Sequence, residues 1–346
     1  MYILALLLSF SLSLLITPLV IRLANKVGAT DKPNERKVHQ KIMPRMGGLA
    51  IFISFFIAGL ILTPNHTTML PIMAGATLVM LIGVFDDIYE LRARTKFLGQ
   101  VAAALIVIMW GGLQVTFINL PFGGELQFGM FSIPITILWI VGITNAINLI
   151  DGLDGLAAGV STIALVTMSV MAIIMGDIFV ATTALILTGG ALGFLKFNFH
   201  PAKIFMGDTG SLFLGYIIAV LSILGFKNVT MISLIVPIII LGVPISDTFF
   251  AIIRRLVNKQ PLAAPDKSHL HHCLVRVGFS HKQAVLLIYA LASAFGLAAI
   301  IFSFATMWGA LIIVGILLIT IELIVEKIGL VGSNYQPLLK IFSNKK

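Results

Sequence analysis

The sequence predicts an all-α fold class, a polytopic membrane helix bundle, on three observations. The 346-residue chain is 59% hydrophobic and only 11% charged, and its mean hydropathy is +1.07, whereas a soluble domain carries about a quarter charged residues. Its apolar runs repeatedly approach the ~20 residues that cross a bilayer as a helix. These runs lack the apolar and polar alternation of barrel strands, so helices are expected. We treat residues 1–346 as one integral-membrane domain.

Eleven spans can be drawn along the chain. They cover residues 1–21, 46–63, 68–85, 97–113, 131–148, 155–175, 178–195, 209–225, 230–252, 283–304 and 308–326. The first span lacks a basic start and a small-residue cleavage site, so a retained helix is favoured over a signal peptide. The segment from Gln114 to Gly129 has β-branched and aromatic residues around Gly123-Gly124, which predicts a small β-hairpin.

Basic residues predict the orientation of these spans. On one side of the predicted membrane lie 22 of the 23 lysines and arginines, and only Lys227 lies on the other. The positive-inside rule then places the N-terminus outside, and it places the long loop 253–282 and the tail 327–346 in the cytoplasm. The net charge of +9 is thereby explained, and no nucleic-acid partner is expected. A single cysteine, Cys273, excludes an intrachain disulfide.

Amides and carboxylates gather where the fifth and sixth spans meet. The stretch Asn145-Ala-Ile-Asn148-Leu-Ile-Asp151-Gly-Leu-Asp154-Gly155 joins them. Polar side chains inside hydrocarbon cost several kcal/mol in most estimates, so a group of four indicates a site. The glycines leave room for backbone N–H groups to approach a ligand. We interpret the stretch as a polar cleft at a membrane face that holds a nucleotide.

Two further acidic motifs lie at the same predicted face. Asp86 and Asp87 end the third span, where adjacent carboxylates repel unless a cation, a basic neighbour or a shared proton relieves them. Arg94 and Lys96 follow closely and could hold an anionic substrate there. Asp208 lies in Phe-Met-Gly-Asp-Thr-Gly-Ser, and it suits either a helix N-cap or a metal ligand beside phosphate-binding amides.

Three histidines, His269, His271 and His272, lie in the predicted long loop. Zinc is one alternative for them, although neither a cysteine pair nor a clear fourth ligand accompanies them. Basic residues nearby favour a cluster that grips a diphosphate. Asp247 and Glu322 lie within predicted spans, where they could serve a proton path or be paired inside the bundle.

Together these features indicate phosphoryl transfer at a membrane face. Carboxylates with substrate phosphates suit Mg²⁺, and the absence of a Walker loop disfavours ATP-driven transport. An ion-coupled transporter is the rival from another class, but no inverted repeat is visible. A scaffold without catalysis leaves the convergence of acids unexplained.

The motifs resemble those of the polyprenyl-phosphate N-acetylhexosamine-1-phosphate transferases over nearly the whole chain. The acidic pair, the Asn-x-x-Asn-x-x-Asp-Gly-Leu-Asp-Gly stretch, Phe-Met-Gly-Asp-Thr-Gly-Ser and His-Leu-His-His occur in the order of that family. The segments 44–48 and 266–272 resemble its N-acetylglucosamine branch, which includes enzymes that start wall teichoic acid linkage units. The resemblance implies transfer of N-acetylglucosamine 1-phosphate from UDP-N-acetylglucosamine to undecaprenyl phosphate in the bacterial plasma membrane, with Mg²⁺ or Mn²⁺. Another UDP-sugar and a homodimer both stay open.

The resemblance also implies roles for individual residues. Asp208 corresponds to the principal metal ligand and Asn148 to a second one. Asp86 and Asp87 correspond to the pair that deprotonates or orients the lipid phosphate. The substrate-binding positions are Arg45, Arg94, Lys96, Asp151, Asp154, His269, His271 and His272. Direct attack by the lipid phosphate is favoured over a covalent enzyme intermediate.

Overall fold

The computed structural model describes residues 1–31, 42–63, 66–119, 124–226, 234–261, 268–331 and 335–343. The long helices are α1 (Tyr2–Val27), α3 (His66–Tyr89), α5 (Ser132–Ile150), α6 (Leu156–Ile174), α7 (Ile178–Asn198), α8 (Gly207–Phe226), α12 (His281–Phe304) and α13 (Met307–Ile328). The shorter helices are α2 (Gly48–Leu62), α4 (Ala93–Met109), α9 (Ile235–Ile240), α10 (Gly242–Val257), α11 (Leu270–Val277), α14 (Pro337–Ser343) and a 3₁₀ turn (Gly129–Phe131). The strands are β1 (Thr30–Asp31), β2 (Met43–Pro44), β3 (Phe117–Asn119) and β4 (Glu125–Gln127).

The prediction of a polytopic helical bundle is confirmed. Eight helices of the described chain are long and apolar enough to cross a membrane, and the protein is a multi-pass membrane protein. Two other predicted spans form shorter helices, because α2 has 15 residues and α4 has 17. At 1.5 Å per residue, both fall short of the ~30 Å hydrocarbon core.

The predicted span 230–252 is not one helix. It divides into α9 and α10 at Leu241, whose backbone leaves the helical region at φ −94° and ψ 21°. Pro244 follows in the first turn of α10. Proline has no N–H to donate to the carbonyl four residues earlier and its ring crowds that carbonyl, which favours a break at this point, although α1 and α3 continue through Pro18 and Pro71.

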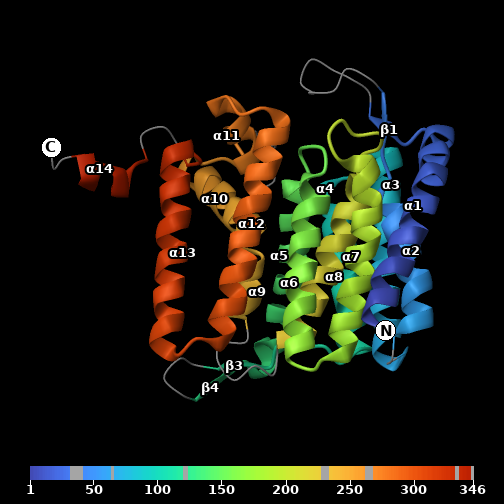
Figure 1. The fold of residues 1–346 in the computed structure, drawn as a ribbon, viewed down its shortest axis with the longest axis horizontal. Coiled ribbons are helices and arrows are strands. Elements are labelled where there is room, and N and C mark those ends of the chain that lie inside the picture. The colour runs from blue at the N-terminus through green and yellow to red at the C-terminus, as the bar shows by residue number, and fades with distance from the viewer. Residues whose placement is uncertain are drawn as a thin grey trace.

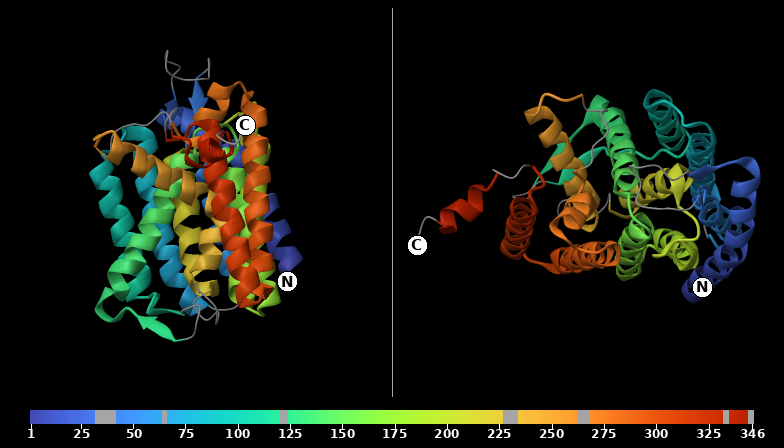
Figure 2. Two further views of the ribbon diagram at one scale, coloured as in Figure 1. Left: turned by 90° about the vertical axis from the view of Figure 1, so that its left-hand side faces the viewer. Right: turned by 90° about the horizontal axis from the view of Figure 1, so that it is seen from above.

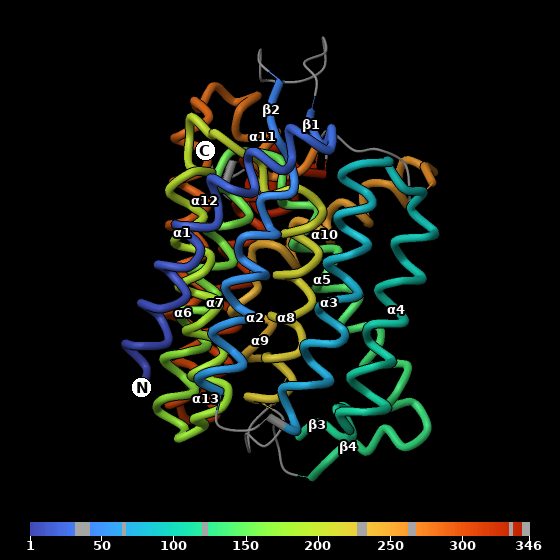
Figure 3. The backbone as a smooth tube through the Cα atoms, turned by 90° about the vertical axis from the view of Figure 1, so that its right-hand side faces the viewer, coloured from blue at the N-terminus to red at the C-terminus, as the bar shows by residue number. Residues whose placement is uncertain are grey.

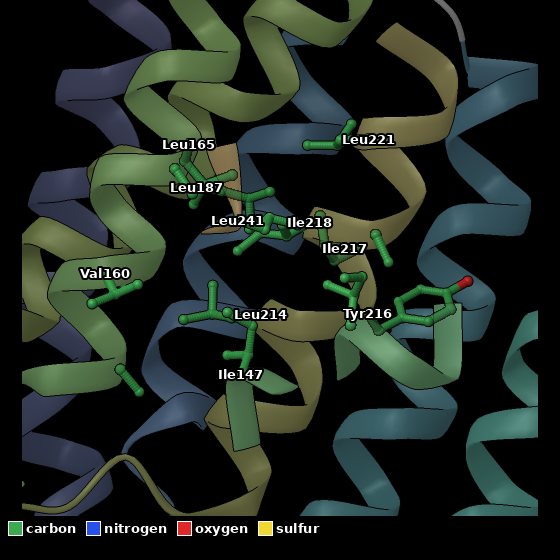
Figure 4. Close-up of a cluster of buried hydrophobic side chains, with 14 of the residues drawn as sticks. Ile147, Val160, Leu165, Leu187, Leu214, Tyr216, Ile217, Ile218, Leu221 and Leu241 are labelled. Carbon is green, nitrogen blue, oxygen red and sulfur yellow. The ribbon is translucent and has the colours of Figure 1, made fainter. Parts of the chain in front are cut away.

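Helix α8 forms the centre of the bundle and carries the site at one end. It is the most enclosed of the eight spans. In its apolar 18-residue stretch, 89% of the residues are buried inside the protein, against 11% in that of α13. Its neighbours include α2, α3 and α5, and Figure 1 shows α13 at the margin with α12 beside it. Leu214, Tyr216 and Ile218 of α8 lie among buried residues from neighbouring helices in Figure 4.

The two ends of the bundle differ. The N-terminus and the β3–β4 hairpin lie at one end, and β1, β2, α11 and the C-terminal helix lie at the other (Figures 1 and 3). The hairpin prediction is confirmed, because β3 and β4 pair antiparallel with Ile118 opposite Leu126. The predicted loop 253–282 is not wholly a loop, since it includes the end of α10 and all of α11. Figure 2 shows the bundle from the side and from above.

Several basic and acidic positions used in the sequence analysis lie outside the described residues. They are Lys32, Arg36, Lys37, Lys41, Lys227, Asp266, Lys267, Lys345 and Lys346.

Candidate functional site

Three aspartates from two helices meet beside one lysine. Asp86 and Asp87 lie in the last turn of α3 and Asp208 in the first turn of α8, and one oxygen from each lies within 4.8 Å of the others. Lys96 of α4 places Nζ 2.8 Å from an oxygen of Asp208 and 3.3 Å from an oxygen of Asp86. Three carboxylates against one ammonium leave the cluster negative, which favours a divalent cation. The buried aspartates could therefore hold a metal ion.

The two adjacent aspartates have different surroundings. Asp87 accepts the backbone N–H of Asp208 at 3.0 Å, and both the N–H and the hydroxyl of Thr209, at 3.1 and 2.6 Å. Its carboxylate therefore caps the N-terminus of α8 from the neighbouring helix, where the positive end of the helix dipole favours an anion. Among the described residues, Asp86 accepts one backbone bond, from Leu91 at 2.9 Å, and it turns its other oxygen toward Lys96.

The close contact between the Asp87 carboxylate and the start of α8 explains why a glycine precedes Asp208. Gly207 has φ +70°, a region that favours glycine, and a Cβ there would lie 2.3 Å from a carboxylate oxygen of Asp87. Because Asp87 caps α8, Asp208 does not serve as the cap. The side chain of Asp208 instead bonds to Lys96 and to Asn148.

The two asparagines of the Asn-x-x-Asn stretch join α5 to two different helices. Asn145 donates to Gln100 of α4 at 2.6 Å. Asn148 donates its amide N–H₂ to Asp208 at 3.2 Å and to Ser211 of α8 at 2.8 Å. As placed, Asn148 is a donor to the candidate metal ligand, and its oxygen would face the cluster after a half-turn of the amide.

The segment that contains Arg45 is held against the loop before Asp208. Gly47 and Gly48 donate their N–H groups to the carbonyls of Phe205 and Met206 at 3.0 Å each. Phe205 in return donates to the carbonyl of Pro44 at 2.9 Å. This ladder brings the Arg45 guanidinium within electrostatic range of Asp87 and Asp151.

Asp151 follows α5 at the edge of the carboxylate cluster. Its side chain is half-buried, and burial, followed by the nearby charges of Asp208 and Asp87, raises its pKa to about 8. Arg45 opposes the rise without cancelling it. In the absence of a bound cation, Asp151 is therefore mainly protonated at neutral pH.

Asp154 has hydrogen-bond partners of its own outside the carboxylate cluster. It accepts from His200 Nδ1 at 2.9 Å and from the N–H of Ala202 at 3.1 Å, and its own N–H donates to His281 Nε2 at 2.9 Å. The sequence analysis missed both histidines because each stands alone in the chain. The Pro that follows His200 and the Ser that precedes His281 were the only local signals, since they mark a turn and a helix start.

The three predicted histidines lie together, with 6.0 Å between the ring centroids of His269 and His271, and α10 fixes one of them. Asp247, buried in α10, lies 2.9 Å from His269 Nδ1 and accepts the N–H of Leu270 at 2.7 Å, so it caps α11. His271 lies against Gly152, where a Cβ would approach its Nε2 to 2.1 Å. Neither of its ring nitrogens has a hydrogen-bond partner among the described residues. His272 lies beside His271, with 4.2 Å between ring centroids.

Burial decides the charge of His271. Its side chain is 2% exposed, and burial with the neighbouring His272 lowers its pKa to about 3. The sequence analysis favoured a cationic grip on diphosphate, but His271 is a neutral imidazole at physiological pH. Arg94 is exposed in the first turn of α4, two residues from Lys96.

Comparison with known proteins gives one consistent result. Residues 69–226 match the family described as "Glycosyl transferase family 4". The chain is 51% identical to a protein of Bacillus subtilis (strain 168) described as a probable undecaprenyl-phosphate N-acetylglucosaminyl 1-phosphate transferase, over 95% of this chain and 92% of the relative. It is 36% identical to the decaprenyl-phosphate N-acetylglucosaminephosphotransferase of Mycolicibacterium smegmatis, over 87% and 84% of the two chains. It is 28% identical to the undecaprenyl-phosphate alpha-N-acetylglucosaminyl 1-phosphate transferase of Escherichia coli (strain K12), over 84% and 82%.

Proposed function

The chain belongs to glycosyl transferase family 4, among its polyprenyl-phosphate N-acetylglucosamine-1-phosphate transferases, and from this premise we propose its reaction. It transfers N-acetylglucosamine 1-phosphate from UDP-N-acetylglucosamine to undecaprenyl phosphate. The products are undecaprenyl-diphospho-N-acetylglucosamine and UMP. The observation that carries the proposal is the cluster of Asp86, Asp87 and Asp208 beside Lys96, at one end of a membrane bundle.

The donor set of the cluster suits Mg²⁺, with Mn²⁺ as a substitute. Carboxylate oxygens are hard ligands, and Mg²⁺ takes one or two of them together with substrate phosphates. Asp208 would hold the ion, and Asn148 would join it after its amide turns. When bound, the ion would offset the negative charge of the diphosphate and of the phosphoryl group in transfer.

Asp86 is the better candidate for the base of the acidic pair. Asp87 is occupied by three hydrogen bonds from the first turn of α8, whereas Asp86 has one oxygen directed toward Lys96. In the proposed step, Asp86 accepts or orients the proton of the lipid phosphate. A lipid phosphate oxygen attacks the sugar-bearing phosphorus of UDP-N-acetylglucosamine, and the bond to UMP breaks.

Lys96 and Arg45 are proposed to face the phosphates. The Lys96 ammonium lies between Asp86 and Asp208, where it can hold a phosphate oxygen beside the carboxylates. Phosphoryl transfer depends mainly on positioning and charge neutralisation, and this arrangement offers both.

The nucleotide is proposed to lie along the turn between α5 and α6. Asp151 and Asp154 flank Gly152 there, and His271 lies against Gly152 with ring nitrogens that have no hydrogen-bond partner in the described part of the chain. A neutral imidazole offers one donor and one acceptor, which suits a ribose, a base or a sugar amide. His269, which Asp247 fixes, and His272 complete the loop side of this proposed site.

The site is proposed to face the cytoplasm, where UDP-sugars are available. The distribution of 22 of 23 basic residues to one side supports this orientation. We further propose that the product serves cell-wall polymer synthesis, as the start of teichoic acid linkage units.

Release of UMP from UDP-N-acetylglucosamine tests the reaction. The purified protein should release UMP with Mg²⁺ only when undecaprenyl phosphate is present, and Asp208→Asn should lose this activity while keeping its thermal unfolding midpoint. UDP-N-acetylgalactosamine and UDP-glucose serve as competing donors in the same assay. Release without the lipid, or full activity of Asp208→Asn at ordinary Mg²⁺, would contradict the proposal.

A further inference from the structure

A second group of metal-ligating side chains lies outside the carboxylate cluster. Asp154, His200 and His281 each offer one ligand atom, and these three atoms lie within 4.8 Å of one another. They come from three separate places in the chain. Asp154 lies in the turn between α5 and α6, His200 lies in the loop between α7 and α8, and His281 is the first residue of α12. The rings of the two histidines lie 4.5 Å apart between centroids.

The chemistry of this group differs from that of the aspartate cluster. Two imidazoles with one carboxylate suit zinc and related transition ions, whereas Mg²⁺ prefers oxygen ligands alone. Three protein ligands with one open position is the usual composition of an exchangeable or catalytic zinc site. We propose that Asp154, His200 and His281 form a binding site for a divalent transition ion, zinc above all, separate from the Mg²⁺ site of the transferase reaction.

The protonation pattern of the group is compatible with metal entry. The backbone N–H of Asp154 donates to His281 Nε2, so this nitrogen carries no proton, and its lone pair becomes available to an ion once that N–H is displaced. His200 Nδ1 lies 2.9 Å from a carboxylate oxygen of Asp154. Zinc would bind Nδ1 of the neutral His200 ring, whose proton then lies on Nε2. The side chain of His200 is 40% exposed and that of Asp154 is 16% exposed, so an ion can reach the site.

The three ligands are held by backbone structure that does not depend on the metal. Ser280 caps α12 by a capping box with Gln283, which fixes the start of the helix at His281. Ala202 donates its N–H to the Asp154 carboxylate. Because His281 must exchange the Asp154 N–H for the ion, the affinity should be lower than that of a closed structural site.

A bound ion would fasten the turn that carries the nucleotide motif. Asp154 belongs to that turn, and Gly155 next to it accepts from the Tyr289 hydroxyl of α12 and donates to Asn198 of α7. Zinc would thus add a link between α7, α12 and the turn. The expected effect is a higher thermal unfolding midpoint, independent of substrate.

Zinc retention by the full-length protein in detergent tests the proposal. The protein is stripped with a chelator, saturated with Mg²⁺ to fill the aspartate cluster, equilibrated with micromolar zinc and desalted. The wild type should retain about one zinc per chain, and Co²⁺ should give the visible absorption of a low-coordinate site with nitrogen ligands. His200→Ala and His281→Gln should each lose this retention at least tenfold.

Two controls separate this site from the alternatives. His66→Ala removes a histidine at the start of α3, at the other end of that helix from Asp86, and should retain zinc as the wild type does. Asp208→Asn should also retain it, because the aspartate cluster is not the zinc site. Equal zinc retention by wild type, His200→Ala and His281→Gln would overturn the proposal, as would no retention by the wild type. Because His200 is exposed, His200→Ala should fold. Circular dichroism checks that the helical content of His200→Ala equals that of the wild type.

Discussion

Asp87 holds Thr209 by two hydrogen bonds to one carboxylate oxygen, from the backbone N–H at 3.1 Å and from the hydroxyl at 2.6 Å. This contact joins the end of α3 to the start of α8, and it orients the turn that presents Asp208. The two adjacent aspartates therefore have different partners, since Asp86 accepts from Lys96 instead. Substitutions at Asp87 and Asp86 should therefore affect different properties of the protein.

Asp87→Asn should lower both stability and turnover, whereas Asp86→Asn should lower turnover alone. Asparagine at 87 keeps one acceptor and turns an N–H₂ toward backbone donors, so at least one charge-assisted bond of about 1.5–3 kcal/mol is lost. Loss of a general base at 86 should cost about 10²–10⁴ in kcat. The measurements are the thermal midpoint in detergent and kcat for UMP release.

Thr209→Ser and Thr209→Val are the matched controls for Asp87. Serine keeps the hydroxyl bond and should keep the midpoint, and valine should lose about 0.5–1.5 kcal/mol. A normal midpoint in Asp87→Asn, or a lowered one in Asp86→Asn, would refute this division of roles.

Lys96→Met should separate metal binding from transfer. Removing the ammonium leaves three carboxylates without their nearest positive charge, so the concentration of Mg²⁺ for half-maximal activity should fall about tenfold, or about 1.4 kcal/mol. The kcat should fall about 10²–10³-fold, as when a group that stabilises developing charge is lost. Lys96→Arg retains the charge and should show the smaller change in Mg²⁺ dependence. A raised Mg²⁺ requirement in Lys96→Met would show that Lys96 does not oppose the cation.

Asp151→Asn should stabilise the metal-free protein at alkaline pH while it weakens substrate use. The folded protein holds the Asp151 proton up to a pKa of about 8, against an ordinary value of 3.8. Stability therefore falls as pH rises from about 4 toward 8, because the unfolded chain releases the proton and the folded chain does not. Asparagine does not titrate, so the midpoint difference from wild type should grow over this range and then level off. Thermal unfolding in a chelator at pH 5, 7 and 8.5 measures it.

The titrating control at this position is Asp151→Glu, which should keep the pH slope of the wild type. If Asp151→Asn and the wild type lose stability in parallel as pH rises, the pKa of Asp151 is not raised in the folded protein.

His271→Gln should flatten the acid side of the stability profile. The folded protein keeps His271 neutral down to a pKa of about 3, whereas the unfolded chain binds a proton near 6.5. The stability from this group is complete above pH 6.5 and is lost as pH falls toward 3, by up to ~1.4 kcal/mol per pH unit. Thermal midpoints between pH 5 and 7.5 should thus change less in His271→Gln than in the wild type. His272→Gln is the comparison and should keep most of the slope, because burial, the larger cause of the lowered pKa of His271, remains.

A second variant at this position tests the role of His271 in binding. A neutral hydrogen bond contributes about 1 kcal/mol, so His271→Ala should weaken UDP-N-acetylglucosamine binding about fivefold. This loss should be constant from pH 6.5 to 8, because the ring carries no charge in that range. A loss that disappears as pH rises through 7 would instead indicate a cationic His271.

The sequence predicted the helical class, the hairpin and the gathering of acids at one end, because these depend on composition and on helix ends. It could not distinguish Asp86 from Asp87, since that difference depends on how α3 packs on α8. At Gly83, a Cβ would lie 2.4 Å from the Cα of Thr209, and this close approach sets the rotation of α3. The partners of Asp154 were also hidden, because His200 and His281 are 46 and 127 residues away. Pro244 marks a position where a helix can break, but Pro18 and Pro71 lie inside continuous helices, so a proline alone does not predict the break at Leu241.

The orientation of the bundle should be measurable with single cysteines. Glu125 is exposed in β4, at the same end as the N-terminus, and Asn258 is exposed just after α10, at the end that carries α11. The native Cys273 is buried and is first replaced by alanine, which gives the unreactive background and control. Because 22 of 23 basic residues favour the α11 end as cytoplasmic, Glu125→Cys should react with an impermeant thiol reagent added to intact cells. Asn258→Cys should react only after permeabilisation. The reverse pattern would invert the protein and remove the proposed site from the cytoplasmic pool of UDP-sugars.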